Sequence, residues 1–264
     1  MKKLLAFALL LSILSNTCII NANESHFYKT DIDGNTFPDE FESFRQYENA
    51  PDYYTKEHQK QLATKIAESE NYLQNKKSTR SGGGTKKLDV PLHYQIREYY
   101  CAPAVAEMII DYKLGRGKSP NQETLADEGK DLAHSVNLKT WALGYTNVGD
   151  LTTVLRKYTK ANYQTQNVND YALGNALVTD IDANYPLALN PRTKRFSEYK
   201  GANLQHFQVA NGYSYEFSGS SGYSKLYYLD SYKNSQYPKA YGRHSIKTDI
   251  MQSALKDNYG LYIW

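Results

Sequence analysis

The apolar positions of the chain change their spacing between residue 100 and the C-terminus. Residues 101–115 (CAPAVAEMIIDYKLG) place apolar side chains at helical spacing and end in a glycine, which predicts a helix. Three later segments also predict helices: PNQETLADEGKDL, NVGDLTTVLRKY and DYALGNALVTDIDANY. The segments that follow are short, β-branched or aromatic runs and predict strands: PLALN, HFQVANGYSY, SKLYYLDSY and YGLYIW. Helices followed by strands indicate an α+β domain with an antiparallel sheet.

The part before this domain is polar and carries a different pattern. Tyr54 to Asn75 contains neither glycine nor proline, and its leucines and isoleucine recur at near-helical spacing, so a helix is expected there. It runs into KKSTRSGGGTKK, whose composition predicts a flexible, protease-accessible linker. We therefore predict a polar and helical extension over residues 23–87, and one compact domain over residues 88–264.

The first residues, MKKLLAFALLLSILSNTCIINANE, combine two lysines, a short apolar run and a polar stretch with small residues. This layout predicts a signal peptide over residues 1–22, and therefore a secreted protein. The apolar run is shorter than the ~20 residues that a spanning helix needs, and no later segment is a better membrane span. Acylation of Cys18 as a lipoprotein anchor is the alternative, but Ser15-Asn16-Thr17 fits a lipoprotein signal poorly.

Composition and charge narrow the classes of partner. The content of 41% hydrophobic and 22% charged residues is that of a globular protein. A formal net charge of +3, without a basic block interleaved with aromatic residues, argues against nucleic acid. The sequence has no cysteine cluster, no histidine pair at metal-ligand spacing and no phosphate-binding glycine loop. We therefore expect neither a metal nor another cofactor.

Cys101 is the first candidate for chemistry. If Cys18 is removed with the signal peptide, Cys101 is the single cysteine of the mature chain. Such a thiol is either a small buried apolar residue or is kept for its reactivity. Pro103 indicates that a helix starts here, so Cys101 lies where unpaired backbone N–H groups favour a thiolate.

A nucleophilic thiol needs a base, and the sequence offers several histidines. His206 begins an alternating run that predicts a strand, and Asp230 ends an apolar strand from which its carboxylate can emerge beside His206. Either residue can instead be structural: a hydrogen-bonded histidine, or a turn aspartate. Asn234 is a weaker orienting candidate. A surface role is expected for His26, His58 and His134, whereas His93 lies close to Gln95 in the sequence and His244 lies in a polar segment near the C-terminus.

Gln95 lies six residues before Cys101 and can donate its side-chain amide to a developing oxyanion beside the N–H of Cys101. Taken together, VPLHYQIREYYCAPAVAEMII, YPLALN, HFQVANGY and LYYLDSY resemble the peptidases that trim double-glycine leaders from bacteriocins, together with their secreted relatives. The resemblance implies a papain-like cysteine peptidase fold, with the catalytic helix packed on the antiparallel sheet.

Carried over by motif, the resemblance makes Cys101 the nucleophile, His206 the proton shuttle, Asp230 the orienting group and Gln95 the second oxyanion donor. The sequence departs from the pattern at Ala102, where relatives have glycine, and at Ser231, where proline often follows the aspartate. The long stretch NPRTKRFSEYKGANLQ before the histidine strand is expected to be a loop over the cleft.

The resulting hypothesis is a secreted bacterial cysteine peptidase that acts on a peptide or protein through a thioester. One alternative is a catalytically silent papain-like module for surface binding or adhesion, which would use the chain's 25 tyrosines. Another is a cell-wall amide hydrolase or acyl transferase, associated with the cell wall. Three roles are open for the extension over residues 23–87: a pro-segment that covers the cleft, a spacer, or an export aid.

Overall fold

The computed structural model describes residues 28–30, 36–38, 55–79, 84–98, 100–131, 148–218 and 221–264. The chain divides into two compact units, residues 1–40 and residues 41–264. In the first unit, β1 (Tyr28–Thr30) and β2 (Thr36–Pro38) pair antiparallel. The predicted signal peptide, His26 and His134 lie outside the described residues.

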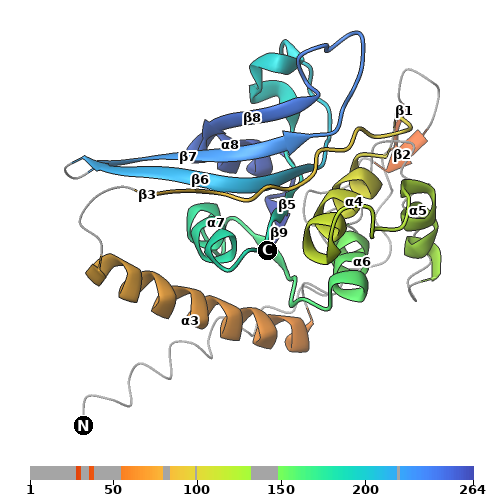
Figure 1. Cartoon of the computed structure of the whole chain (residues 1–264). Helices are drawn as coiled ribbons and strands as arrows, with labels where there is room; N and C mark the ends of the chain where they lie inside the picture. Colours follow the sequence, from red (N-terminus) through yellow and green to blue (C-terminus); the bar gives the residue numbers. More distant parts are fainter. Residues whose placement is uncertain are drawn as a thin grey trace. The chain divides into compact units, whose positions relative to one another are not determined.

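The helices of the second unit include all those that the apolar spacing predicts. They are α3 (Lys56–Thr79), α4 (Cys101–Leu114), α5 (Gln122–Asp131), α6 (Val148–Thr159), α7 (Leu173–Asp182) and α8 (Thr248–Lys256). The helix α4 is buried on most of its surface, and α5, α6 and the sheet pack around it (Figure 1). It ends at Gly115, whose positive φ of 108° suits glycine and whose N–H donates to the carbonyl of Asp111.

The strands form a seven-stranded sheet in which every pairing is antiparallel. They are β3 (Gly84–Lys87), β4 (Thr165–Asn167), β5 (Leu187–Leu189), β6 (Gln208–Ser218), β7 (Ser221–Asp230), β8 (Gly242–Lys247) and β9 (Leu261–Ile263). The order is β4-β9-β5-β6-β7-β8, and β3 pairs with β6. The predicted α+β class with an antiparallel sheet is confirmed.

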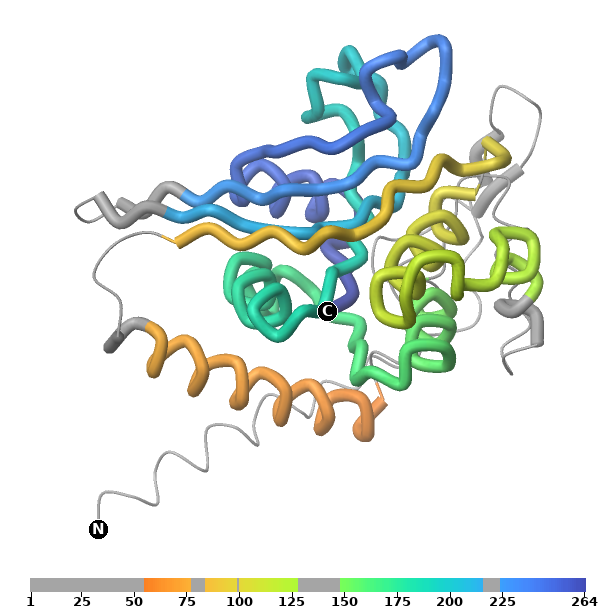
Figure 2. The backbone as a smooth tube through the Cα atoms, in the orientation of Figure 1, coloured from red at the N-terminus to blue at the C-terminus, as the bar shows by residue number. Residues whose placement is uncertain are grey.

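The long strand β6 organises the sheet. Along one edge it pairs with β7, and along the other it pairs first with β5 and then with β3. Figure 2 shows β3, in yellow, following β6 closely. At Gly212, opposite Lys87, an added Cβ would lie 2.6 Å from the carbonyl oxygen of Lys86. A glycine is therefore required for this strand to approach.

The strand β3 corrects one expectation. The linker was predicted to reach Lys87, but Gly84–Lys87 is paired with β6, so the sheet begins inside the predicted linker. Composition favours a linker there because lysine and glycine have low strand propensity. Backbone pairing with an existing long strand overrides that propensity.

The helix α3 also belongs to this unit and lies along α7 (Figure 1). Leu62 is 2% exposed, and the Ser69 hydroxyl lies 2.6 Å from that of Thr179. His58, expected at the surface, is 7% exposed, and its Nε2 lies 3.0 Å from the carbonyl oxygen of Thr165. That expectation was wrong, because the polarity of the surrounding sequence does not reveal that β4 runs beside the start of the helix.

Replacing Gly212 with valine should destabilise the domain by about 1–3 kcal/mol, because the new side chain meets the β3 backbone. Urea denaturation measures the loss. Gly174→Ala is the control, since its added Cβ meets only Thr248 Cγ2 at 3.8 Å and alanine favours a helix. Equal stability of the two variants would contradict the close β3–β6 approach.

Replacing Leu62 with alanine should cost about 2–5 kcal/mol in the free energy of unfolding, the range for a buried leucine. Leu114→Ala removes the same atoms from a side chain that is 47% exposed, and should change stability by less than about 0.5 kcal/mol. If both variants unfold like the parent, α3 does not contribute to the stability of the domain.

Candidate active site

The site begins at the N-terminus of α4, where Cys101 is the first helical residue and is 8% exposed. No side chain caps this end of the helix, and its first turn contains no acidic residue. The unpaired N–H groups and the positive end of the helix dipole therefore act on the sulfur. The backbone N–H groups of Ala102 and Phe207 both form hydrogen bonds with it. The position of Cys101 thus favours an anion.

His206 connects the sulfur with a carboxylate. It lies two residues before β6, and its backbone N–H donates to the carbonyl of Pro191. The ring is buried and contacts Cys101 through a hydrogen bond. Its Nε2 lies 2.8 Å from Oδ1 of Asp230, so Nε2–H donates to the carboxylate and Nδ1 is left to face the thiol.

Asp230 is the last residue of β7 and is fully buried. Its Oδ1 accepts from His206 and from the backbone N–H of Tyr232, at 2.8 Å each. Its Oδ2 accepts from the Tyr199 hydroxyl and from Nε2 of Gln208, at 2.7 Å each. Four donors take the place of water around this carboxylate, as a buried anion requires.

Two of these donors were missed by sequence reasoning. Gln208 is two positions after His206, and the period of an extended chain places both residues on one face. That signal was available. Tyr199 is 31 positions before Asp230, inside a stretch without regular periodicity, and no local pattern marks it.

The three groups shift one another's ionisation. Burial alone raises the pKa of Cys101, but His206 and the two backbone N–H groups outweigh burial and hold this pKa below its usual value. Burial lowers the pKa of His206, whereas the charge and hydrogen bond of Asp230, together with Cys101, raise it to about 10. Burial would raise the pKa of Asp230, yet His206 and the other donors keep it low. These shifts favour the thiolate of Cys101 beside an imidazolium and a carboxylate.

Gln95 lies beside this cluster but is otherwise engaged. Its backbone N–H donates to the carbonyl of Ser231 at 2.9 Å, and its side-chain oxygen accepts from the Ser231 hydroxyl at 3.2 Å. Its Nε2 donates to the carbonyls of Arg97 and Glu98 at 3.0 and 2.6 Å. Both amide hydrogens are therefore used, and donation to an oxyanion requires that one of these bonds opens. That role stays a prediction.

The remaining candidates lie outside the cluster. The Asn234 amide donates to the Tyr232 hydroxyl at 3.1 Å, and none of its described hydrogen bonds reaches His206. Asn234 was therefore wrong as an orienting group. The Nε2 of His244 lies 2.7 Å from the carbonyl oxygen of Ala240.

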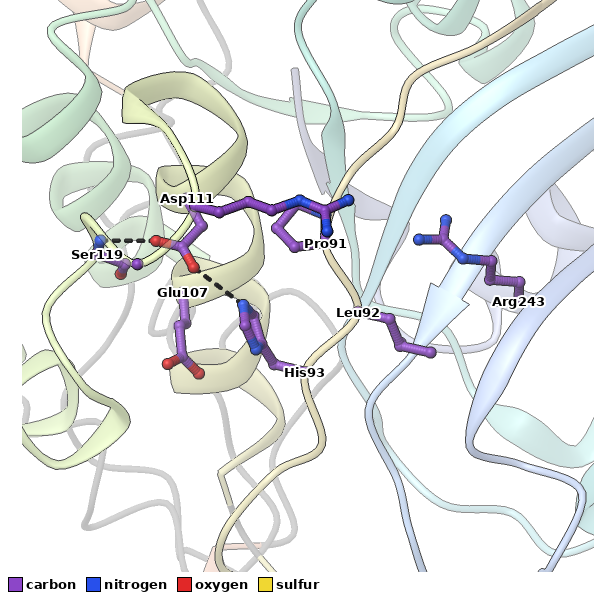
Figure 3. Close-up of a pocket in the computed structure, with 9 residues that line it drawn as sticks. Pro91, Leu92, His93, Glu107, Asp111, Ser119 and Arg243 are labelled. Carbon is purple, nitrogen blue, oxygen red and sulfur yellow. Dashed lines mark hydrogen bonds and ion pairs between the residues drawn. The ribbon is translucent and has the colours of Figure 1, made fainter.

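A cavity of about 350 Å³ lies between α4 and β8, away from the cluster. Its lining includes His93, whose Nε2 lies 3.0 Å from Oδ2 of Asp111, and Arg243 of β8. In Figure 3 the His93 ring points to Asp111. Arg243 lies on the other side of Leu92 from His93. None of the four predicted site residues lines this cavity, so it is separate from the reacting groups.

Within the described ranges, no three histidine, cysteine, aspartate or glutamate side chains are placed to hold a metal ion. In the same part of the chain, no helix is long and apolar enough to span a membrane.

The sequence pattern of the Peptidase_C39 like family matches residues 87–253. The chain belongs to this family. It is a cysteine-type peptidase, a hydrolase of papain-like fold, and the family predicted from the sequence is confirmed. The matched range contains Gln95, Cys101, His206 and Asp230.

Among solved structures, the chain is similar to a double glycine motif protease from an AMS/PCAT transporter, crystallised in complex with the leader peptide. The two share 14% sequence identity, over 70% of this chain and 96% of that chain, with a TM-score of 0.35. None of the curated proteins matches the sequence.

Iodoacetamide should alkylate Cys101 at pH 6 at least about tenfold faster than free cysteine, whose pKa is about 8.5. The reason is that the pKa of Cys101 is lowered, so a larger share of this thiol than of free cysteine is ionised at pH 6. In His206→Ala the imidazole no longer offsets the effect of burial on the thiol. The pKa of Cys101 therefore rises, and the rate of alkylation at pH 6 falls. Mass spectrometry of the Cys101 peptide over pH 5–9 measures this. The same pH dependence in parent and variant would contradict the pairing.

Proposed function

We propose that this protein is a secreted bacterial cysteine peptidase that hydrolyses peptide or related amide bonds through Cys101, His206 and Asp230. The observation that carries the proposal is the position of His206, whose ring contacts the Cys101 thiol and the Asp230 carboxylate in one buried cluster. This is the arrangement that an activated nucleophile needs: a base beside it, and a third group that orients the base.

In the first half of the reaction the Cys101 thiolate attacks the carbonyl carbon of the scissile bond. A C–S bond forms, and the carbonyl electrons move to oxygen. The imidazolium of His206 then gives its Nδ1 proton to the leaving nitrogen as the C–N bond breaks. The amine departs, and the acyl group remains on Cys101 as a thioester.

In the second half, the neutral imidazole of His206 takes a proton from water as the water oxygen attacks the thioester. The C–S bond breaks, the acid product leaves, and the thiolate–imidazolium pair is restored. Asp230 receives no proton: it holds the ring through Nε2 and stabilises its positive charge. The Cys101 N–H, at the start of α4, is the expected oxyanion donor, with the Gln95 amide as the second donor once it is released.

For the extension over residues 23–87, the proposal assigns the α3 part to the working enzyme rather than to a cleft-blocking pro-segment. Within the described part of the chain, hydrogen bonds and ion pairs join α3 to α7, β4, β6 and nearby loop residues, and none of these bonds reaches Cys101, His206 or Asp230. Secretion rests on the residue pattern of the first 22 positions. Detection of the chain in the culture medium of its host, cut after Ala22, tests it.

Cys101→Ala and His206→Ala should each lower turnover by about 10⁴-fold or more, because each removes a reacting group. A library of peptides, digested and analysed by mass spectrometry, supplies the substrate, and purified peptidoglycan is run in parallel to detect cell-wall amide hydrolysis. His244→Gln is the control, since its ring bonds the Ala240 carbonyl away from the cluster. Full activity of Cys101→Ala on a peptide that the parent cleaves would overturn the proposal.

A further inference from the structure

The stretch between β5 and β6 is a folded element with its own internal bonds. It contains two 3-10 turns, η3 (Thr193–Arg195) and η4 (Ser197–Tyr199), and closes through a bridge between Arg192 and Gln205. The Thr193 hydroxyl donates to the carbonyl of Ala202 and accepts from the N–H of Leu204, at 2.6 and 2.9 Å. The position of this stretch over the cleft stays a prediction, and its internal bonds make it a fixed support for the residues between them.

Tyr199 ends the second of these turns and is fully buried. Its backbone N–H donates to the carbonyl of Phe196, and its own carbonyl accepts from Ala202. Its ring stacks on that of Tyr232 at 6.2 Å and packs against Tyr237 at 5.5 Å. Backbone bonds and ring packing together fix where its hydroxyl lies.

We propose that Tyr199 is a positioning residue, whose hydroxyl holds Oδ2 of Asp230 so that Oδ1 faces Nε2 of His206. The inference rests on the proposed roles of Cys101, His206 and Asp230. The ring of Tyr199 also packs against that of His206, with centroids 6.0 Å apart, whereas its hydroxyl bonds the carboxylate and acts on His206 through it.

The physical basis is the burial of that carboxylate. Asp230 is fully buried and bulk solvent does not supply a substitute, so losing a donor to one oxygen favours rotation of the carboxylate toward another donor. With only Gln208 left on Oδ2, the carboxylate is free to rotate away from its alignment with the His206 ring. Burial and the charge of Asp230 raise the pKa of Tyr199, so its hydroxyl keeps the proton that it donates.

Tyr199→Phe keeps the ring and removes only the hydroxyl. We expect kcat/KM for a peptide that the parent cleaves to fall about 10- to 100-fold, with most of the loss in kcat. We also expect the pH profile of iodoacetamide alkylation at Cys101 to move to higher pH, because a loosely held imidazolium stabilises the thiolate less. A purely structural role would lower the melting temperature without moving that profile.

Tyr237→Phe is the matched control. It removes a hydroxyl from a mostly buried ring of the same cluster, and none of the described hydrogen bonds joins Tyr237 to Asp230. Its turnover and alkylation profile should equal those of the parent. If Tyr199→Phe also equals the parent while Asp230→Asn is impaired, the inference is overturned and the proposed function stands.

The double variant Tyr199→Phe/Asp230→Asn measures whether the two substitutions act through the same interaction. If Tyr199 acts through Asp230, the double variant turns over as slowly as Asp230→Asn alone, whereas independent effects multiply. Multiplied losses overturn the inference and leave the proposed function intact. An unimpaired Asp230→Asn overturns the inference, because the carboxylate that Tyr199 holds would not be needed, and it leaves the roles of Cys101 and His206 to the alanine variants described above.

Discussion

The active site depends on three ionisable groups, Cys101, His206 and Asp230, that are kept together out of water. Burial by itself would neutralise the thiolate of Cys101, the imidazolium of His206 and the carboxylate of Asp230, since each charged form loses its hydration. The other charged groups and the surrounding donors replace water and so favour each charged form. The arrangement tolerates little displacement of these donors, because a donor that moves away leaves a buried charge without a hydrogen bond. It therefore demands a rigid surrounding structure.

That rigidity comes from where the chain places the three residues. Cys101 is fixed by a helix that is buried on most of its surface, and Asp230 by the end of a strand paired on both edges. His206 enters from the start of β6, the strand that pairs with β7. Because β6 and β7 are antiparallel, the start of β6, next to His206, lies beside the end of β7, which carries Asp230. Gly212 lets β3 join the same strand and extends the sheet.

The donors around Asp230 and the bonds of Gln95 show how the site is joined to the rest of the domain. Gln208 on β6 and Tyr199 from the preceding stretch hold one carboxylate oxygen. On the other side, Ser231 joins Gln95 to the end of β7 through its carbonyl and its hydroxyl. A proline at that position would keep the carbonyl bond and lose the hydroxyl bond. The departure from the family pattern at Ser231 thus adds one link between the segment before α4 and the sheet.

The sequence by itself determined the family and most of the local elements, although β4, β8 and α8 were not predicted. Helical spacing after Cys101, the strand that ends at Asp230, and the order of the motifs around them can be predicted because they depend on neighbours within one or two turns or a few strand positions. Tertiary structure alone decided the rest: the bond from Tyr199 to Asp230, the burial of His58 against β4, and the carbonyls that occupy the Gln95 amide. These contacts are either long-range or set by one particular turn. A hydrogen bond needs two atoms within about 3 Å of each other. The spacing of apolar residues predicts which face of an element is buried, but it does not predict which polar groups will meet on that face.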